Sequence, residues 1–193
     1  MTRVCVYAGS NAGARPEYTT AAEKLATVLV ERGIGIVYGG GNVGLMGVLA
    51  DTALAAGGEV IGVMPQSLVA REIGHRGLTE LRIVASMHER KATMADLSDA
   101  FVALPGGVGT LEELVEVLTW SQLGLHAKPC ALLDTSGYYA PLVAFFDHAV
   151  GEGFLRPQHR EMLLVGDDPA SLVDRFATWQ APAVHKWIDL DDT

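Results

Sequence analysis

A glycine-rich turn that leads into a helix carries the most recognisable chemistry of this chain. The run Leu104-Pro105-Gly106-Gly107-Val108-Gly109-Thr110-Leu111-Glu112-Glu113 reads as the end of an apolar strand, a turn and the first part of a helix. Glycine lacks a Cβ, so the backbone of such a turn can approach a ligand closely, and the unpaired amides at a helix start donate hydrogen bonds to anions. The run therefore predicts a phosphate-binding turn.

Glu113 gives this turn a possible catalytic group. A carboxylate beside a bound phosphate is repelled unless it has a chemical task or a cationic neighbour. The adjacent cations Arg90 and Lys91 are the candidates for that neighbour. Two structural alternatives stay open: Arg90 and Lys91 as a solvated basic pair, and Thr110 with Glu113 as a capping box in which Thr110 is the N-cap.

A second glycine run, Gly39-Gly40-Gly41-Asn42-Val43-Gly44, has the G-x-G-x-x-G spacing of dinucleotide-binding proteins. In those proteins an acidic residue at the far end of the next strand binds the ribose, whereas Glu59 here precedes that strand. A glycine wall for a mononucleotide phosphate or sugar therefore fits better. Tight packing between strand and helix is the structural alternative for Gly44 and Gly47.

The elements that must position these residues alternate along the chain. Short apolar runs predict strands at Arg3–Tyr7, Gly35–Tyr38, Val60–Val63, Arg82–Val84, Phe101–Leu104, Cys130–Leu133 and Met162–Val165. Helical patterns lie between them, at Glu17–Glu31, Gly44–Ala56, Ser86–Ser98, Thr110–Leu123, Tyr139–Glu152 and Ala170–Trp179. We expect an α/β fold: one Rossmann-like domain spanning residues 1–193, a doubly wound parallel sheet flanked by helices, with 180–193 as a tail.

One edge of this predicted sheet collects the chemistry. Turn residues follow the strands at Gly9-Ser10, Gly39–Gly41, Pro65, Ser86 and Pro105–Gly107. In an open parallel sheet, ligands bind in the crevice outside the carboxyl ends of the strands. We therefore expect the following residues of this edge to contact the substrate: Gly9, Ser10, Gly40, Gly41 and Met87.

Composition narrows the partners. The formal charge is −9 and the sequence has no basic run, so nucleic acid and anionic membranes are poor partners. Cys5 and Cys130 lie in apolar runs, which favours reduced core thiols in a cytoplasmic protein. The six histidines show no metal-binding spacing, and the P-loop pattern is absent, so we expect neither a metal nor a cofactor.

Together these motifs resemble the LOG ("lonely guy") family of cytokinin riboside 5′-monophosphate phosphoribohydrolases. The family signature P-G-G-x-G-T-x-x-E with an upstream R-K pair is present as Pro105–Glu113 and Arg90-Lys91. The resemblance implies catalytic roles for Arg90 and Glu113. It implies substrate-binding roles for Glu72, Lys91, Gly107, Val108, Gly109, Thr110, Leu111, Glu112 and Thr119. It also implies a homodimer with active sites near the subunit interface.

The reaction that this resemblance implies is hydrolysis of the N-glycosidic bond of a cytokinin riboside 5′-monophosphate or AMP, which releases the free base and ribose 5-phosphate. Many family members were labelled lysine decarboxylases, but a pyridoxal enzyme needs a Schiff-base lysine, and only Lys91 lies at the predicted ligand edge. A mononucleotide sensor without catalysis and an NAD-dependent enzyme are the alternatives. The sequence does not distinguish adenine from N6-prenylated adenine as the preferred base.

Overall fold

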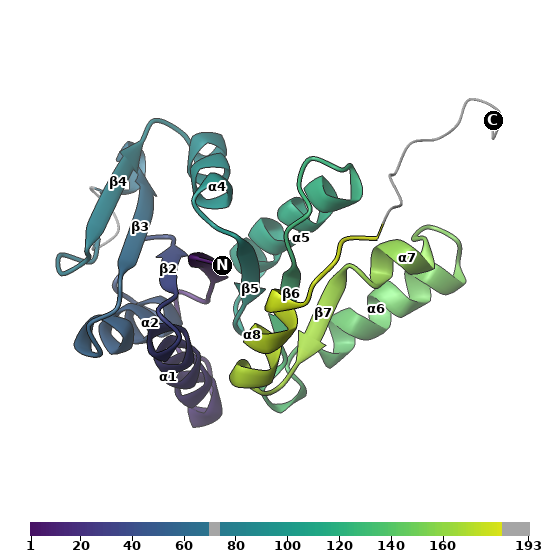
Figure 1. Cartoon of the computed structure of the whole chain (residues 1–193), viewed down its shortest axis with the longest axis horizontal. Coiled ribbons are helices and arrows are strands. Elements are labelled where there is room, and N and C mark those ends of the chain that lie inside the picture. Colours follow the sequence, from purple (N-terminus) through teal and green to yellow (C-terminus); the bar gives the residue numbers. More distant parts are fainter. Residues whose placement is uncertain (70–73, 183–193) are drawn as a thin grey trace.

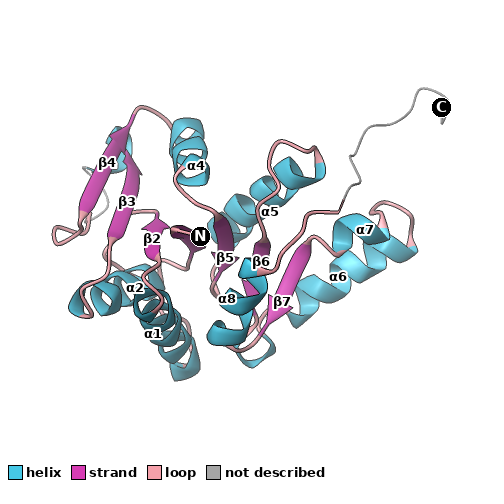
Figure 2. Cartoon of the chain, viewed as in Figure 1, coloured by secondary structure: helices cyan, strands magenta, loops and turns pink. Residues whose placement is uncertain are grey.

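A seven-stranded parallel sheet forms the centre of the protein. The computed structural model describes residues 1–69 and 74–182. Its strands are β1 (Arg3–Tyr7), β2 (Gly35–Tyr38), β3 (Val60–Pro65), β4 (Glu80–Val84), β5 (Ala100–Ala103), β6 (Cys130–Leu133) and β7 (Leu163–Gly166). They pair in the order β4-β3-β2-β1-β5-β6-β7, and every pair is parallel. The predicted doubly wound α/β fold is thus confirmed (Figure 2).

Helices cover both faces of this sheet. They are α1 (Pro16–Glu31), α2 (Gly44–Ala55), α3 (Gln66–Val69), α4 (Met87–Asp96), α5 (Val108–Gln122), α6 (Ala140–Gly151), α7 (Pro157–Arg160) and α8 (Pro169–Ala177), with a 3-10 turn, η1 (Thr135–Gly137). In Figure 1, α1, α2 and α8 lie below the sheet and α4 and α5 lie above it. No helix among the described residues is long and apolar enough to cross a membrane.

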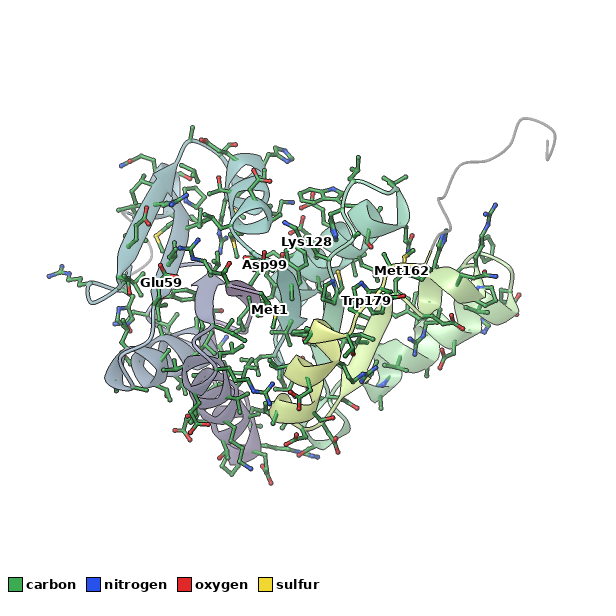
Figure 3. The ribbon with its side chains drawn as sticks, in the orientation of Figure 1. Met1, Glu59, Asp99, Lys128, Met162 and Trp179 are labelled. Carbon is green, nitrogen blue, oxygen red and sulfur yellow. The ribbon has the colours of Figure 1, made fainter. Side chains whose placement is uncertain are left out.

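The two layers enclose two hydrophobic clusters. Leu25, Leu49 and Phe176 pack one layer onto its face of the sheet, while Met94 and Leu114 pack the other. Strands β2, β5 and β6 are buried along their whole length, which is why they read as continuous apolar runs and not as alternating ones. Trp179, beyond α8, packs against both clusters (Figure 3). The predicted core thiols are confirmed, since Cys5 and Cys130 are free and buried.

The order of the strands decides where a ligand can bind. The chain proceeds outward from the central β1 to β2, β3 and β4, and α4 then carries it back to β5, on the other side of β1. The loops that leave β1 and β5 therefore turn in opposite directions and leave a crevice at the carboxyl ends of these strands. The loop after β1 begins at Ala8, and Pro105–Gly107 follows β5.

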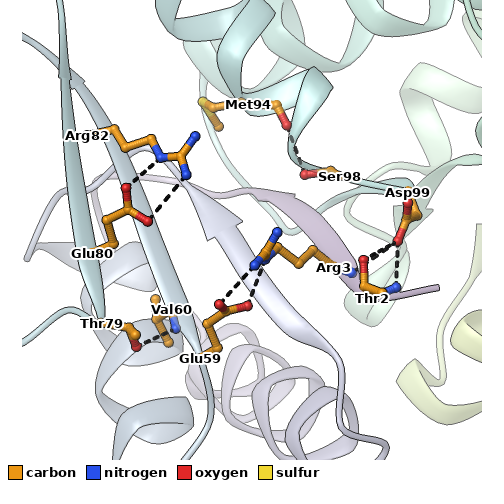
Figure 4. Close-up of polar contacts among 10 residues, drawn as sticks. All are labelled: Thr2, Arg3, Glu59, Val60, Thr79, Glu80, Arg82, Met94, Ser98 and Asp99. Carbon is orange, nitrogen blue, oxygen red and sulfur yellow. Dashed lines mark hydrogen bonds and ion pairs between the residues drawn. The ribbon is translucent and has the colours of Figure 1, made fainter.

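The opposite edge, at the amino ends of the strands, is joined by an ion pair and by hydrogen bonds. Arg3 donates to Glu59 from Nε at 2.7 Å and from Nη2 at 3.0 Å (Figure 4). Nearby, the Asp99 carboxylate accepts a hydrogen bond from the Thr2 hydroxyl at 2.9 Å. Glu59 thus lies far from the position of a ribose-binding acid, in agreement with its place in the sequence.

Several boundaries differ from the sequence-based prediction. Helix α5 begins at Val108 and not at Thr110, because Gly107 takes the extended conformation of an N-cap (φ −89°, ψ −156°). The capping-box alternative for Thr110 and Glu113 is therefore wrong, and Glu113 lies in the second turn of the helix. The short elements α3, α7 and η1 were not predicted, because four residues or fewer carry no clear periodicity. Much of the predicted tail, residues 183–193, lies outside the described residues.

Candidate active site

The glycine turn before α5 has two kinds of glycine. A Cβ at Gly106 would lie 2.1 Å from Thr110 Oγ1 and 2.9 Å from Gly9 N, so the packing of the turn itself requires glycine there. A Cβ at Gly107 or Gly109 would meet no other protein atom within 4 Å. Internal packing therefore does not explain these two glycines, whereas close approach of a ligand to the backbone does.

Arg90 is held at the carboxyl ends of β2 and β3. Its Nε donates to the Val63 carbonyl at 3.1 Å and its Nη2 to the Gly39 carbonyl at 3.4 Å. A Cβ at Gly39 would lie 2.0 Å from Nη2, so glycine at this strand end makes room for the guanidinium. The helix that carries Arg90 is capped by Ser86, whose side chain accepts from Glu89 N at 3.1 Å. The Glu89 carboxylate in turn accepts a hydrogen bond from the backbone N–H of Ala85, the residue before the cap.

Glu113 meets Arg90 across the crevice, as the sequence predicted. Its Oε1 lies 3.5 Å from Arg90 Nη2, and the two side chains are only 12% and 11% exposed. Burial raises the pKa of the Glu113 carboxyl above its ordinary value, and the charge of Arg90 opposes that rise. The neighbouring carboxylates of Glu112 and Glu116 raise the pKa of Glu113 further. The site thus holds a desolvated carboxylate against a guanidinium, the kind of pairing that marks functional sites.

Lys91 has a different neighbourhood from the one expected. Its Nζ lies 2.5 Å from Glu112 Oε1 and 3.0 Å from Glu116 Oε2, one turn apart on α5. Lys91 therefore joins α4 to α5 and does not pair with Glu113. Hydrogen bonds to Glu112 and Glu116 raise the pKa of the Lys91 amine, although burial opposes this rise.

A cavity of about 310 Å³ opens beside Glu113. It is lined by Ala8, Gly9, Ser10, Met46, Met87, Arg90, Gly107, Val108, Gly109, Thr110, Glu112 and Glu113. Ten of the predicted substrate-binding or catalytic residues are thus brought together, from the loops after β1 and β5 and from α4 and α5. A mononucleotide can be accommodated in a cavity of this size.

Other predicted site residues lie elsewhere. Gly40, Gly41, Lys91, Leu111 and Thr119 do not line this cavity, and Glu72 lies outside the described residues. Leu111 packs against the hydrophobic cluster on its side of the sheet. Local packing accounts for Gly40, which has φ +80° and lies against Leu81 and Met64. Gly44 likewise packs on the backbone of Ser10, so the structural alternative explains it.

Met46 and Ala8 line the cavity but were not predicted. Met46 lies in the first turn of α2, two residues after Gly44. The sequence did offer a signal for Met46: Gly44 lies at a turn from a strand to a helix, and the residues that follow such a turn lie near the crevice at the sheet edge. Ala8 directly follows β1 and gave no chemical signal, since its side chain is apolar and small.

These features define a Rossmann-like α/β protein with a carboxylate–guanidinium site at the switch point of its sheet. The family model described as "Possible lysine decarboxylase" matches residues 46–176. The chain belongs to this family, within which it is a member of the LOG group of cytokinin riboside 5′-monophosphate phosphoribohydrolases that the resemblance predicted.

Relatives of known name support this assignment. The probable phosphoribohydrolase LOGL9 of Oryza sativa subsp. japonica is 53% identical over 174 residues, which cover 90% of this chain and 77% of the relative. The phosphoribohydrolase LOG7 of Arabidopsis thaliana is 48% identical over 178 residues, which cover 92% and 82%. Among solved structures, the molybdenum cofactor carrier protein of Chlamydomonas reinhardtii has a TM-score of 0.70 at 21% identity, covering 92% of this chain and 98% of the other. This last likeness concerns the fold alone.

The structure argues against the decarboxylase description. A Schiff base forms only from an unprotonated amine. Lys91, the one lysine expected at the ligand edge, is held between two carboxylates that favour its charged form. The predicted rejection of a pyridoxal mechanism therefore gains a geometric reason.

Proposed function

We propose that this protein hydrolyses the N-glycosidic bond of cytokinin riboside 5′-monophosphates and of AMP, releasing the free base and ribose 5-phosphate. The observation that carries the proposal is the convergence of Glu113 and Arg90 on one cavity beside the glycine turn, at 3.5 Å from each other. The relatives at about 50% identity are named as enzymes of the cytokinin reaction. AMP is our extension of that substrate class, since the cavity leaves the base undetermined.

The mechanism follows from the charge that develops on the sugar. As the bond between C1′ and the base nitrogen lengthens, positive charge accumulates on C1′ and O4′. The ionised carboxylate of Glu113 stabilises that charge more strongly in the transition state than in the ground state. Water then adds to C1′, and its proton is transferred to the departing base. Glu113 acts as electrostatic stabiliser, as the group that orients this water, or as a transient nucleophile.

The phosphate needs donors other than the lysine. Arg90, Lys91, Glu112, Glu113 and Glu116 together carry two positive and three negative charges, so the side chains alone do not attract an anion. The backbone amides at the start of α5 supply donors and partial positive charge. Arg90 supplies the remaining cation, either to the phosphate or to the departing base.

Glu113→Gln tests the catalytic role. We expect turnover of isopentenyladenine riboside 5′-monophosphate to fall by about 10²–10³-fold, because one preorganised charge partner is lost. Free base and ribose 5-phosphate are quantified by chromatography, with the matching nucleosides as substrates that lack the phosphate. Near-normal turnover by the variant would reject the proposed role of Glu113.

A sensor that binds a mononucleotide without cleaving it is the second candidate. The buried Arg90–Glu113 pair and the glycine turn would serve binding equally well, so the cavity alone does not separate the two functions. Calorimetry in parallel with product analysis does. Saturable binding of the nucleotide with no release of base would favour the sensor.

We further propose a homodimer in which α5 of one copy reaches the site of the other. Thr119 follows Glu113 by six residues, so it lies about 9 Å along the helix and about 120° around its axis from the carboxylate. It does not line its own cavity, which lies at the start of the helix. Exposed apolar side chains accompany it on α4, on α5 and just beyond: Met87, Val108, Val115, Leu123 and Leu125.

The cytoplasmic location expected from the sequence stays a prediction.

Mixing two variants, each altered on one side of the proposed shared site, tests this arrangement. In a heterodimer of Glu113→Gln with Thr119→Ala, one site combines an intact Glu113 with the intact Thr119 of the other subunit. We expect mixing to restore activity that neither variant has alone, and sedimentation to give twice the mass of the chain. A monomer by sedimentation, or no gain on mixing, would contradict the proposal.

A further inference from the structure

Three consecutive carbonyl groups in the turn before α5 are each bound by another element. The Leu104 carbonyl accepts from the Tyr139 hydroxyl at 2.6 Å, and the Pro105 carbonyl accepts from Gly9 N at 3.2 Å. The Gly106 carbonyl accepts from the Tyr138 hydroxyl, also at 2.6 Å. The two tyrosines come from the segment between β6 and α6, more than thirty residues away. The turn is thus fixed from outside, peptide by peptide.

The peptide between Gly106 and Gly107 has the greatest need of such support. Neither residue has a Cβ, so side-chain sterics do little to oppose rotation of this peptide plane. All peptide bonds among the described residues are trans, and in a trans peptide the carbonyl and the following N–H point in opposite directions. Because the Gly106 carbonyl points to Tyr138, the Gly107 N–H points away from Tyr138.

Two cavities border this peptide, and Tyr138 lines one of them but not the other. Gly107 borders both the cavity that contains Glu113 and Arg90, which Tyr138 does not line, and a second cavity of about 250 Å³. Tyr138 lines this second cavity, together with Tyr18, Gly106 and Gly107. The Tyr138 ring contacts the rings of Tyr18 and Tyr139 edge-on, with centroids 5.5 and 4.9 Å away. These contacts keep its hydroxyl in place even though the residue is 39% exposed.

We infer that Tyr138 is a positioning residue for the anion site: its hydroxyl fixes the Gly106–Gly107 peptide so that the Gly107 N–H is directed toward the substrate phosphate. This inference rests on the proposed function for the identity of the anion. Tyr139 differs in its effect, because the Leu104 carbonyl that it binds is followed by Pro105, which has no N–H to direct. Tyr138 and Tyr139 are thus a matched pair of adjacent tyrosines: one binds a carbonyl that is followed by an N–H, and the other binds a carbonyl that is not.

Tyr138→Phe is the test, with Tyr139→Phe as its matched control. Loss of the hydroxyl leaves the competent orientation only partly populated, so we expect Tyr138→Phe to raise KM about 3- to 10-fold with kcat nearly unchanged. The melting temperature should change little, because the Gly106 carbonyl can be solvated. Tyr139→Phe leaves a buried carbonyl without a donor, so we expect its melting temperature to fall by about 2–10 °C with KM unchanged.

A binding measurement separates this inference from the proposed function. Calorimetry with ribose 5-phosphate reports on the anion site whether or not the protein turns over a nucleotide. We expect Tyr138→Phe to weaken this affinity by the same factor as it raises KM, and to leave affinity for ribose unchanged. Unchanged affinity for ribose 5-phosphate, or an equal loss for ribose, would overturn the inference. Absence of turnover with the binding loss intact would overturn the proposed function alone.

Discussion

Replacing glycines of the turn before α5 by alanine should separate binding from stability. A Cβ at Gly107 meets no protein atom within 4 Å, and φ at this residue is −89°, which alanine adopts freely. Alanine is a weaker N-cap than glycine but restricts the unfolded chain, and these effects of about 0.5–1 kcal/mol oppose each other. We therefore expect the melting temperature of Gly107→Ala to stay within about 2 °C of the parent.

Binding should respond quite differently to Gly107→Ala. Gly107 lines the cavity where the phosphate is proposed to contact the backbone, so we expect the new methyl group to keep at least one amide from reaching the phosphate. A hydrogen bond to a charged group contributes about 1.5–3 kcal/mol, which corresponds to about a 10- to 150-fold rise in KM. Steady-state kinetics with isopentenyladenine riboside 5′-monophosphate, beside a thermal melt of the same preparation, measures both quantities.

Two further glycines serve as controls. At Gly106 the new Cβ would lie 2.1 Å from Thr110 Oγ1 and 2.7 Å from Thr110 Cβ, so overpacking should cost about 1–3 kcal/mol and lower the melting temperature by about 2–12 °C. Gly151, at the end of α6, has open space like Gly107 but lies outside the site, and its alanine variant should keep both properties. A Gly107→Ala protein with normal KM, or with the melting loss expected of Gly106→Ala, would refute the reasoning.

Four more outcomes follow from the charges of the site. Because burial raises the pKa of Glu113, kcat should fall with decreasing pH, and the midpoint of this fall should lie above pH 4.5. A carboxyl group whose pKa is raised in the folded state loses its contribution to stability as the pH rises through that pKa. Glu113→Gln should therefore melt no lower than the parent at pH 7.5. Lys91→Met removes a positive charge that lowers the pKa of Glu113, and it leaves Glu112 and Glu116 unpaired. The acidic limb of the pH–rate profile should therefore move to higher pH. A shift of this limb to lower pH would contradict the expectation. Arg90→Lys cannot reach both carbonyls that hold the guanidinium, so we expect a loss of kcat/KM of about 10²-fold, and full activity would show that a point charge suffices.

The sequence predicted the sheet well because most of its parallel strands are buried on both faces, although the edge strand β4 is largely exposed. All seven strands lie where the sequence predicted them, with boundaries off by two residues at most. The start of α5 was missed because Thr110 is a common N-cap residue, whereas the observed N-cap is Gly107, whose preference is weaker. Local sequence rules therefore located the turn but not the first residue of its helix.

The site was predictable where a motif joined neighbouring residues and less so where packing joined distant ones. The meeting of Arg90 and Glu113 followed from the common edge of the sheet, and the structure confirms that they approach each other. The partners of Lys91 depend on how α4 lies along α5, which no local pattern specifies, although the spacing of Glu112 and Glu116 was visible. Gly39 is required by a guanidinium fifty-one residues later, a relation that only the fold creates.

The return of the chain through α4 has a consequence for how this protein can fail. Arg90 belongs to the segment before β5 and Glu113 to the segment after it, so the reactive pair is divided between the two halves of the sheet. A nick near residue 97 would leave each fragment with one member of the pair and half of the crevice. Such fragments should be inert individually, and recovery of turnover on mixing them would report directly that β1 and β5 have re-paired.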